Sequence, residues 1–179
     1  MIKTDELYIV NYCHPDCEPF MNICRLPKEE AFSKARKMAA AHPDTTAFFR
    51  FADFDNYYPL RMKQDKELYS LFVSLGGKPK EKHPLSFVLQ GSEYLDHWFG
   101  NGTVSRLDLK DIPAEFISFT LGDSGAVFEK SGKLTVHTKE TLLKMIREYQ
   151  GSINDFMDEV KEKYDYIEAQ LWNDDFLKY

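Results

Sequence analysis

The apolar positions in the first half of the chain follow strand and helix patterns in turn. Leu7–Tyr12 is a short run rich in branched and aromatic residues, which is typical of a strand. Lys28–His42 carries apolar residues at helical spacing, and Thr45–Phe51 predicts a second strand. A second helical stripe follows, and a pair of glycines is expected to end it: Leu68, Leu71, Phe72, Leu75, then Gly76-Gly77. The N-terminal part is therefore predicted to be strand-helix-strand-helix.

The middle of the chain, about residues 85–137, predicts a run of short strands. Leu85–Leu89 is continuously apolar, as expected of a central strand, and a short helical turn follows through Phe99. Asn101-Gly102 is a strong turn signal. Four further strands are predicted after it: Val104–Leu109, Phe116–Leu121, Val127–Glu129 and Leu134–Val136. Because no crossover helix fits between them, we expect an antiparallel meander.

The last part, about residues 138–172, predicts helices. Apolar residues recur at spacings of three and four from Leu142 to Leu171. Gly151-Ser152, with Asp155 three residues after the serine, indicates a break and a new helix N-cap. We expect two helices whose apolar seam packs on the sheet, with partial packing on another copy of the chain as the alternative.

These patterns predict one domain, residues 1–179, of the α+β class. The expected architecture is a mostly antiparallel sheet of about six or seven short strands, packed against helices, with a helical C-terminal third. Aromatic residues make up 15% of the 179 residues, which favours a well-packed core and leaves room for a ring-lined ligand cleft.

Charge and composition narrow the classes of function. The net charge is −6, which argues against a general nucleic-acid binder, because such proteins usually present a basic surface. No apolar run approaches the roughly 20 residues that span a bilayer, so we expect no membrane association. Three cysteines confined to one short segment do not resemble a secreted disulfide framework. We therefore expect a cytoplasmic protein.

The early cysteine segment is the most suggestive of metal chemistry. Cys13, His14, Cys17 and Cys24 supply thiolate and imidazole groups, which are zinc ligands. Their spacing matches no known zinc motif, because two are adjacent and no second Cys-x-x-Cys pair follows. Zinc at these four residues is one hypothesis, and buried thiols without a metal are the alternative. The sequence requires no cofactor.

A ring-rich polar segment suggests a ligand site. Arg50, Tyr57, Tyr58 and Arg61 offer charge and hydrogen bonding beside ring surfaces, a mixture that suits a small polar or anionic ligand. Asp53 is a candidate acid or base in the same segment, and Asp53–Tyr58 is expected to form a turn that Pro59 ends. The alternative is that the rings fill the core and the acids cap the turn.

Two later segments add candidates. Trp98 extends the predicted ligand site, and His97, one helical turn after Glu93, is a candidate catalytic base. In the strand that follows, alternation places Ser118 and Thr120 on one face. Gly122–Gly125 is expected to be a hairpin turn, although Asp123 could bind a metal there.

No nucleotide-binding, kinase, zinc-finger or catalytic-triad motif is complete, so two hypotheses remain. The first is a small domain that binds a small polar or anionic ligand in an aromatic-lined cleft, with or without a reaction on that ligand. The second is a non-catalytic module that binds a protein partner through its acidic C-terminal helix. A metal-dependent enzyme using the cysteine segment is a third reading. Homo-oligomerisation is compatible with each, and the sequence does not decide whether the chain is an enzyme.

Overall fold

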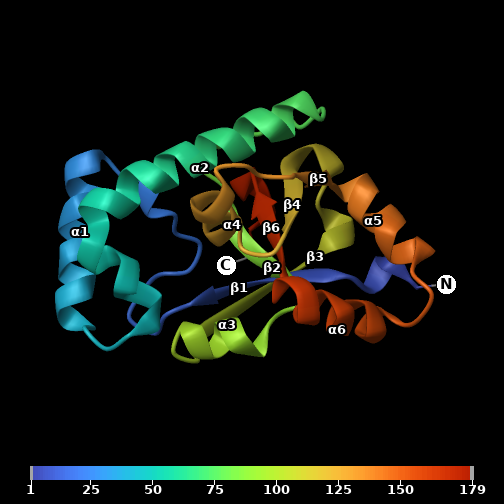
Figure 1. Cartoon of the computed structure of the whole chain (residues 1–179), viewed down its shortest axis with the longest axis horizontal. Coiled ribbons are helices and arrows are strands. Elements are labelled where there is room, and N and C mark those ends of the chain that lie inside the picture. The colour runs from blue at the N-terminus through green and yellow to red at the C-terminus, as the bar shows by residue number, and fades with distance from the viewer. Residues whose placement is uncertain (1, 178–179) are drawn as a thin grey trace.

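A computed structural model describes residues 2–177 and places six strands in one antiparallel sheet (Figure 1). The strand order is β3-β1-β2-β6-β4-β5. The strands are β1 (Tyr8–Cys13), β2 (Leu85–Leu89), β3 (Thr103–Asp108), β4 (Ile117–Leu121), β5 (His137–Thr138) and β6 (Ile167–Leu171). The α+β class and the antiparallel sheet are therefore confirmed.

Helices lie on both faces of this sheet (Figure 1). They are α1 (Lys28–Ala41), α2 (Phe54–Ser74), α3 (Glu93–Trp98), α4 (Ser124–Ser131), α5 (Lys139–Glu148) and α6 (Ile153–Tyr164). Short 3-10 helices connect them: η1 (Thr4–Glu6), η2 (Ile23–Arg25), η3 (Thr46–Asp53), η4 (Leu109–Asp111), η5 (Ala114–Phe116) and η6 (Asp174–Phe176). Among residues 2–177, no helix is both long and apolar enough to cross a membrane.

One face of the sheet is apolar and carries the main core. Its strands contribute alternate residues such as Ile9, Phe87 and Phe119, all at most 1% exposed. Leu142 of α5 and Val160 of α6 belong to the same cluster, so both helices pack on this face. The part of the predicted apolar seam that lies in α5 and α6 therefore packs on the sheet. It also leaves the opposite face of the sheet to α2 and α4.

The strand predicted at Thr45–Phe51 is wrong. Thr46–Asp53 forms the 3-10 helix η3. Phe48, Phe51 and Phe54 are three residues apart, which is the period of a 3-10 helix, so their rings fall on one side. Consecutive rings in this series are 5.7 and 5.6 Å apart between centroids. The dense run of phenylalanines gave these residues the appearance of a strand.

The turn predicted at Asp53–Tyr58 is also corrected, because α2 begins at Phe54 and includes Pro59. The N–H groups of a first helical turn need no partner within the helix, and Pro59 lies only just beyond that turn. The helix therefore gives up one backbone hydrogen bond. It continues to Ser74, and Gly76 follows with a φ of 94°, as the glycine pair predicts.

The meander predicted for residues 85–137 is wrong in three respects. Val127–Glu129 lies in α4, whose N-cap Asp123 accepts a hydrogen bond from the Ala126 N–H at 2.7 Å. Gly122–Gly125 is therefore a helix start rather than a hairpin turn. Leu134–Val136 lies outside the strands, and β5 begins only at His137. In addition, β2 and β3 are not neighbours, because β1 lies between them.

The largest correction concerns the end of the chain. The helix predicted to reach about residue 172 ends at Tyr164, and Ile167–Leu171 is β6, a central strand between β2 and β4. Asp165, with a φ of 66°, breaks the helix. The residues of β6 also alternate, since Ile167, Ala169 and Leu171 face the apolar core. Their spacing from Val160 and Tyr164 resembles a helical stripe, which hid the strand.

Candidate functional site

The second face of the sheet carries polar side chains where a core would normally be apolar. Ser118 and Thr120 of β4 and Glu168 and Gln170 of β6 point to this face, and each is at most 5% exposed. Their apolar neighbours along each strand point to the opposite face. Helices α2 and α4 cover this face and add Gln64 and Ser124, both at most 2% exposed. We call these six residues the polar layer.

Glu168 is at the centre of the polar layer. Ser124 at the start of α4 donates to it twice, from Oγ to Oε1 at 2.8 Å and from its backbone N–H to Oε2 at 2.9 Å. The Gln170 amide also donates to Oε1, at 3.1 Å. Gln64 of α2 in turn donates to Ser124 Oγ at 2.8 Å. The carboxylate is thus held from the sheet and from both covering helices.

The hydrogen bonds continue along the layer towards Trp172. Gln170 Nε2 donates to Thr120 Oγ1 at 3.0 Å, and Ser118 Oγ donates to Gln170 Oε1 at 2.8 Å. The Trp172 indole donates to Ser118 Oγ at 2.8 Å, and its ring stacks on Phe72 of α2. Buried polar groups must be paired to avoid a large desolvation cost, and these pair with one another. The layer is therefore a defined and rigid network.

Burial, together with the nearby charge of Asp123, raises the pKa of Glu168 to a net value of about 7. The hydrogen bonds from Ser124 and Gln170 act in the opposite direction because they stabilise the charged form. A carboxyl group with this pKa changes its protonation near neutral pH, which is the requirement for a general acid or base. Sequence reasoning missed this residue.

Polar and charged side chains from α2, from the N-cap of α4 and from the segment before β6 border the layer. Tyr166 donates from its hydroxyl to Asp123 at 2.7 Å, and its burial raises its pKa above the usual range. Burial also raises the pKa of Tyr57, on which the charges of Arg61 and Asp123 act in opposite directions. The charge of Arg61 also acts on Glu168. We call Tyr57, Arg61, Asp123 and Tyr166 the rim.

Aromatic side chains and one arginine lie beside the rim at the surface. Phe49 and Tyr94 are 56% and 59% exposed, and both contact the ring of Trp98, with centroids 5.7 and 5.8 Å away. Arg50 lies over Phe49 and Tyr57, 5.6 and 5.2 Å from their centroids, and forms an ion pair with Glu129 of α4. We call Phe49, Tyr94 and Trp98 the ring patch. Arg50 connects it to the rim.

The structure brings together some of the residues predicted for a ligand site and separates others. Arg50, Tyr57, Arg61 and Trp98 follow one another along the rim and the ring patch. Tyr58 instead packs against Phe32 and Phe54 in a separate aromatic cluster. Asp53 is exposed and accepts a hydrogen bond from Asn56. His97 is also exposed, with Nδ1 2.8 Å from the Glu93 carbonyl oxygen. Neither candidate for acid–base chemistry reaches the polar layer.

The four residues proposed as zinc ligands do not form one cluster. Within the described part of the chain, potential ligand atoms gather in two groups, His14–Asp16–His42 and Cys24–Asp65–His83. Cys13 and Cys17 belong to neither group, although the Cys13 thiol lies 3.4 Å from the Cys17 carbonyl oxygen. All three cysteines are free thiols. The group around Cys24 uses two residues that the sequence did not suggest.

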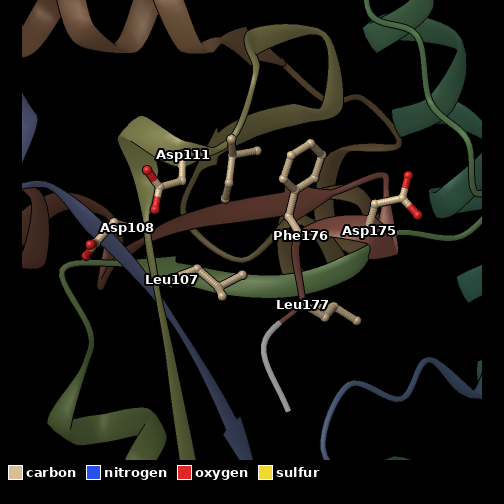
Figure 2. A pocket seen from close by; sticks show the side chains of 7 residues that line it. Leu107, Asp108, Asp111, Asp175, Phe176 and Leu177 are labelled. Atoms are coloured by element: carbon tan, nitrogen blue, oxygen red, sulfur yellow. The ribbon is translucent and has the colours of Figure 1, made fainter.

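Two hollows lie elsewhere on the surface. One, of about 170 Å³, is lined by Asp108, Asp111 and Asp175 together with the apolar side chains of Leu107, Phe176 and Leu177 (Figure 2). Asp108 and Asp175 form ion pairs with Arg106 and Lys80. The other, of about 780 Å³, lies between the N-terminal segment and the start of α6. None of the candidate residues predicted from sequence lines either hollow.

Comparisons with protein-family models, curated proteins and solved structures give no match for this chain. The site must therefore be interpreted from its own geometry.

Proposed function

We propose that this chain binds a small polar or anionic ligand at the surface formed by the ring patch and the rim. One observation carries this proposal. A buried network of paired polar side chains replaces an apolar core on one sheet face, and it is bordered by arginine, tyrosine and exposed rings. Binding sites combine apolar or aromatic surface with a few oriented polar groups, as this arrangement does.

Each part of the surface has a distinct role in this proposal. The rings of Phe49, Tyr94 and Trp98 stack on a planar part of the ligand. Arg50 is one-third exposed and already lies over two rings, so its guanidinium can contact an anionic group while it remains near Glu129. If a reaction follows binding, Glu168 is the group suited to exchange a proton, acting through the rim.

The alternative of a protein-binding module has less support. The apolar seam that motivated it lies in the core, where Leu142, Ile146 and Phe156 are at most 7% exposed. On the outer face of α6, two acidic residues pair with lysines of the same helix, Asp158 with Lys161 and Glu159 with Lys163. The acidic C-terminal helix is thus shorter than predicted, and two of its acidic side chains are paired with lysines. A cytoplasmic location and self-association stay predictions.

The ligand proposal is tested with a compound screen on matched variants. Nucleotides, sugar phosphates and aromatic carboxylates are added to the wild type at millimolar concentration, and thermal unfolding and ligand-observed NMR are recorded. Compounds that bind are then measured with Arg50→Ala and Trp98→Ala, and with Arg106→Ala as the control. Arg106 is also an arginine over a ring, 3.7 Å from the centroid of Tyr8 on β1, and it does not belong to the rim or the ring patch.

We expect binding to weaken about five- to thirtyfold in the two site variants, as loss of a cation–π or stacking contact costs about 1–2 kcal/mol. The Arg106→Ala control should bind like the wild type. Equal binding by all variants would place the ligand elsewhere, and the absence of any ligand among these classes would contradict the proposal. Arg61 is left unchanged in this test because it also contacts Asp65.

A further inference from the structure

Cys24, Asp65 and His83 bring a thiol, a carboxylate and an imidazole together from three separate segments. One ligand atom from each lies within 4.8 Å of the other two. Cys24 comes from η2, Asp65 from the middle of α2, and His83 from the segment before β2. Cys24 and Asp65 are 5% and 1% exposed, and the side chain of His83 is 16% exposed. Sulfur, nitrogen and carboxylate oxygen are the ligand atoms that zinc uses in proteins.

The Asp65 carboxylate is only half satisfied by the protein. His83 Nδ1 lies 2.8 Å from Oδ2, and Asn22 Nδ2 donates to the same oxygen at 3.3 Å. The other oxygen, Oδ1, is buried and has no hydrogen-bond partner among the described residues. The nearest cation is Arg61, whose Nη2 is 3.6 Å from Oδ1 and outside hydrogen-bonding distance. Oδ1 therefore has an ion-pair neighbour but no hydrogen bond, and direct coordination of a cation would satisfy it.

We propose that Cys24, Asp65 and His83 form a binding site for a transition-metal ion, with zinc as the preferred metal. Zinc takes four ligands in a tetrahedron, with bonds of roughly 2.0–2.3 Å. The three side chains supply three of them, and water can supply the fourth on the more exposed side of His83. The ion replaces the proton shared between His83 and Asp65, and the Cys24 thiol loses its proton to solvent.

Arg61 is the charged neighbour of this site. Without a metal, its charge faces the Asp65 carboxylate and Cys24 remains a neutral thiol. With a divalent ion, the thiolate and the carboxylate together neutralise the metal, so Arg61 faces a neutral centre rather than a second net positive charge. The metal would then tie η2 and the segment before β2 to α2. With three protein ligands and one water, the metal would keep one exchangeable coordination position.

The other group, His14–Asp16–His42, is the natural control. Asp16 is exposed, so solvent can satisfy its carboxylate oxygens, and its backbone N–H donates to His14 Nδ1 at 3.2 Å. Asp16 already forms an ion pair with His42, with 3.0 Å between the carboxylate and Nε2. Both groups contain a His–Asp ion pair, but among the described residues only Asp65 has a buried carboxylate oxygen without a hydrogen bond.

The experiment titrates tag-free protein, stripped of metal with a chelator, with Co²⁺ and then Zn²⁺. We expect about one equivalent of cobalt to give a near-ultraviolet thiolate-to-cobalt band that zinc removes. Cys24→Ser should abolish this band, and His83→Gln should weaken binding about tenfold or more. Cys17→Ser, His42→Gln and Trp98→Ala should behave like the wild type. Because Trp98 belongs to the ring patch, the metal result is independent of the ligand proposal.

A second measurement covers the case in which Cys24→Ser does not fold. Wild-type protein is alkylated with iodoacetamide, with and without zinc, and each cysteine is followed by mass spectrometry. Zinc should slow modification of Cys24 at least tenfold and leave Cys17 unchanged. Folded wild type that shows no thiolate band and no zinc protection of Cys24 would overturn the proposal. An unchanged band in Cys24→Ser would also do so.

Discussion

Glu168 is a buried carboxyl group whose hydrogen-bond donors are all uncharged. Its three donors are the Ser124 hydroxyl, the Ser124 backbone N–H and the Gln170 amide. Such donors lower the energy of the charged form, whereas burial raises it more, and the net effect is a pKa raised to about 7. Because the pKa of the unfolded chain stays near 4.5, folding and proton binding are coupled at this residue.

This coupling predicts the pH dependence of stability for Glu168→Gln. The folded-state pKa is above the unfolded value, so the contribution of Glu168 is fully present below about pH 4.5 and is lost as the pH rises to about 7. In the wild type, that loss should amount to about 2–3 kcal/mol between pH 5 and pH 8, at roughly 1.4 kcal/mol per pKa unit. Glutamine does not titrate, so the variant should not show this loss. The free energy of unfolding of the wild type, minus that of Glu168→Gln, should therefore fall by this amount from pH 5 to pH 8.

The measurement is urea unfolding of both proteins at pH 5 and pH 8, with Glu162→Gln as the control. Glu162 is an exposed glutamate of α6, and its substitution should leave the pH dependence unchanged. A constant difference between wild type and Glu168→Gln at the two pH values would show that the carboxyl keeps an ordinary pKa in the folded protein.

At the same scale, residue type predicted part of the candidate site. Arg50, Tyr57, Arg61 and Trp98 were selected because arginines and rings suit polar ligands, and the fold places them in one series. Glu168 was missed because its neighbours in sequence fit a helical spacing. A polar side chain inside a predicted helix is expected to be exposed, whereas in a central strand both faces are covered.

Among the elements, α6 has the start that the sequence predicted most directly. The Ser152 hydroxyl accepts from the Asp155 N–H at 3.1 Å, and the Asp155 carboxylate accepts from the Ser152 N–H at 2.8 Å. This reciprocal pair is a capping box, which depends only on residues three apart and can therefore be read from the sequence. The 3-10 helix η3 was not predicted, because its three-residue period arises where rings pack against α1 and α2.

Ser152→Ala should destabilise the protein by about 1 kcal/mol, because the N-cap hydroxyl satisfies a backbone N–H at the start of α6. Chemical denaturation at neutral pH measures the change. Ser33→Ala is the matched control, since Ser33 is exposed in the interior of α1, where alanine is a slightly better helix former. Equal effects of the two substitutions would contradict the capping role.

For the whole molecule, the sequence predicted the class but not the order of the strands. The fold class follows from the local spacing of apolar residues, which is two in strands and three or four in helices, and most elements show it. The order depends on pairings between distant segments, such as Phe87 with Ala169, and no local pattern carries them. Because β6 follows the last helix yet lies between β2 and β4, the polar layer forms only when the end of the chain has joined the sheet.

A chain truncated after Tyr164 should therefore fail to fold. It would lack β6, which supplies Ile167, Ala169 and Leu171 to the apolar core and Glu168 and Gln170 to the polar layer. It would also leave β2 and β4 with unpaired edges inside the sheet. Thermal unfolding followed by circular dichroism should show no cooperative transition, and amide NMR signals should have narrow dispersion. Adding a synthetic peptide of residues 165–177 should restore part of the signal. A truncated chain that unfolds cooperatively near the midpoint of the full chain would show that β2 and β4 can pair without β6.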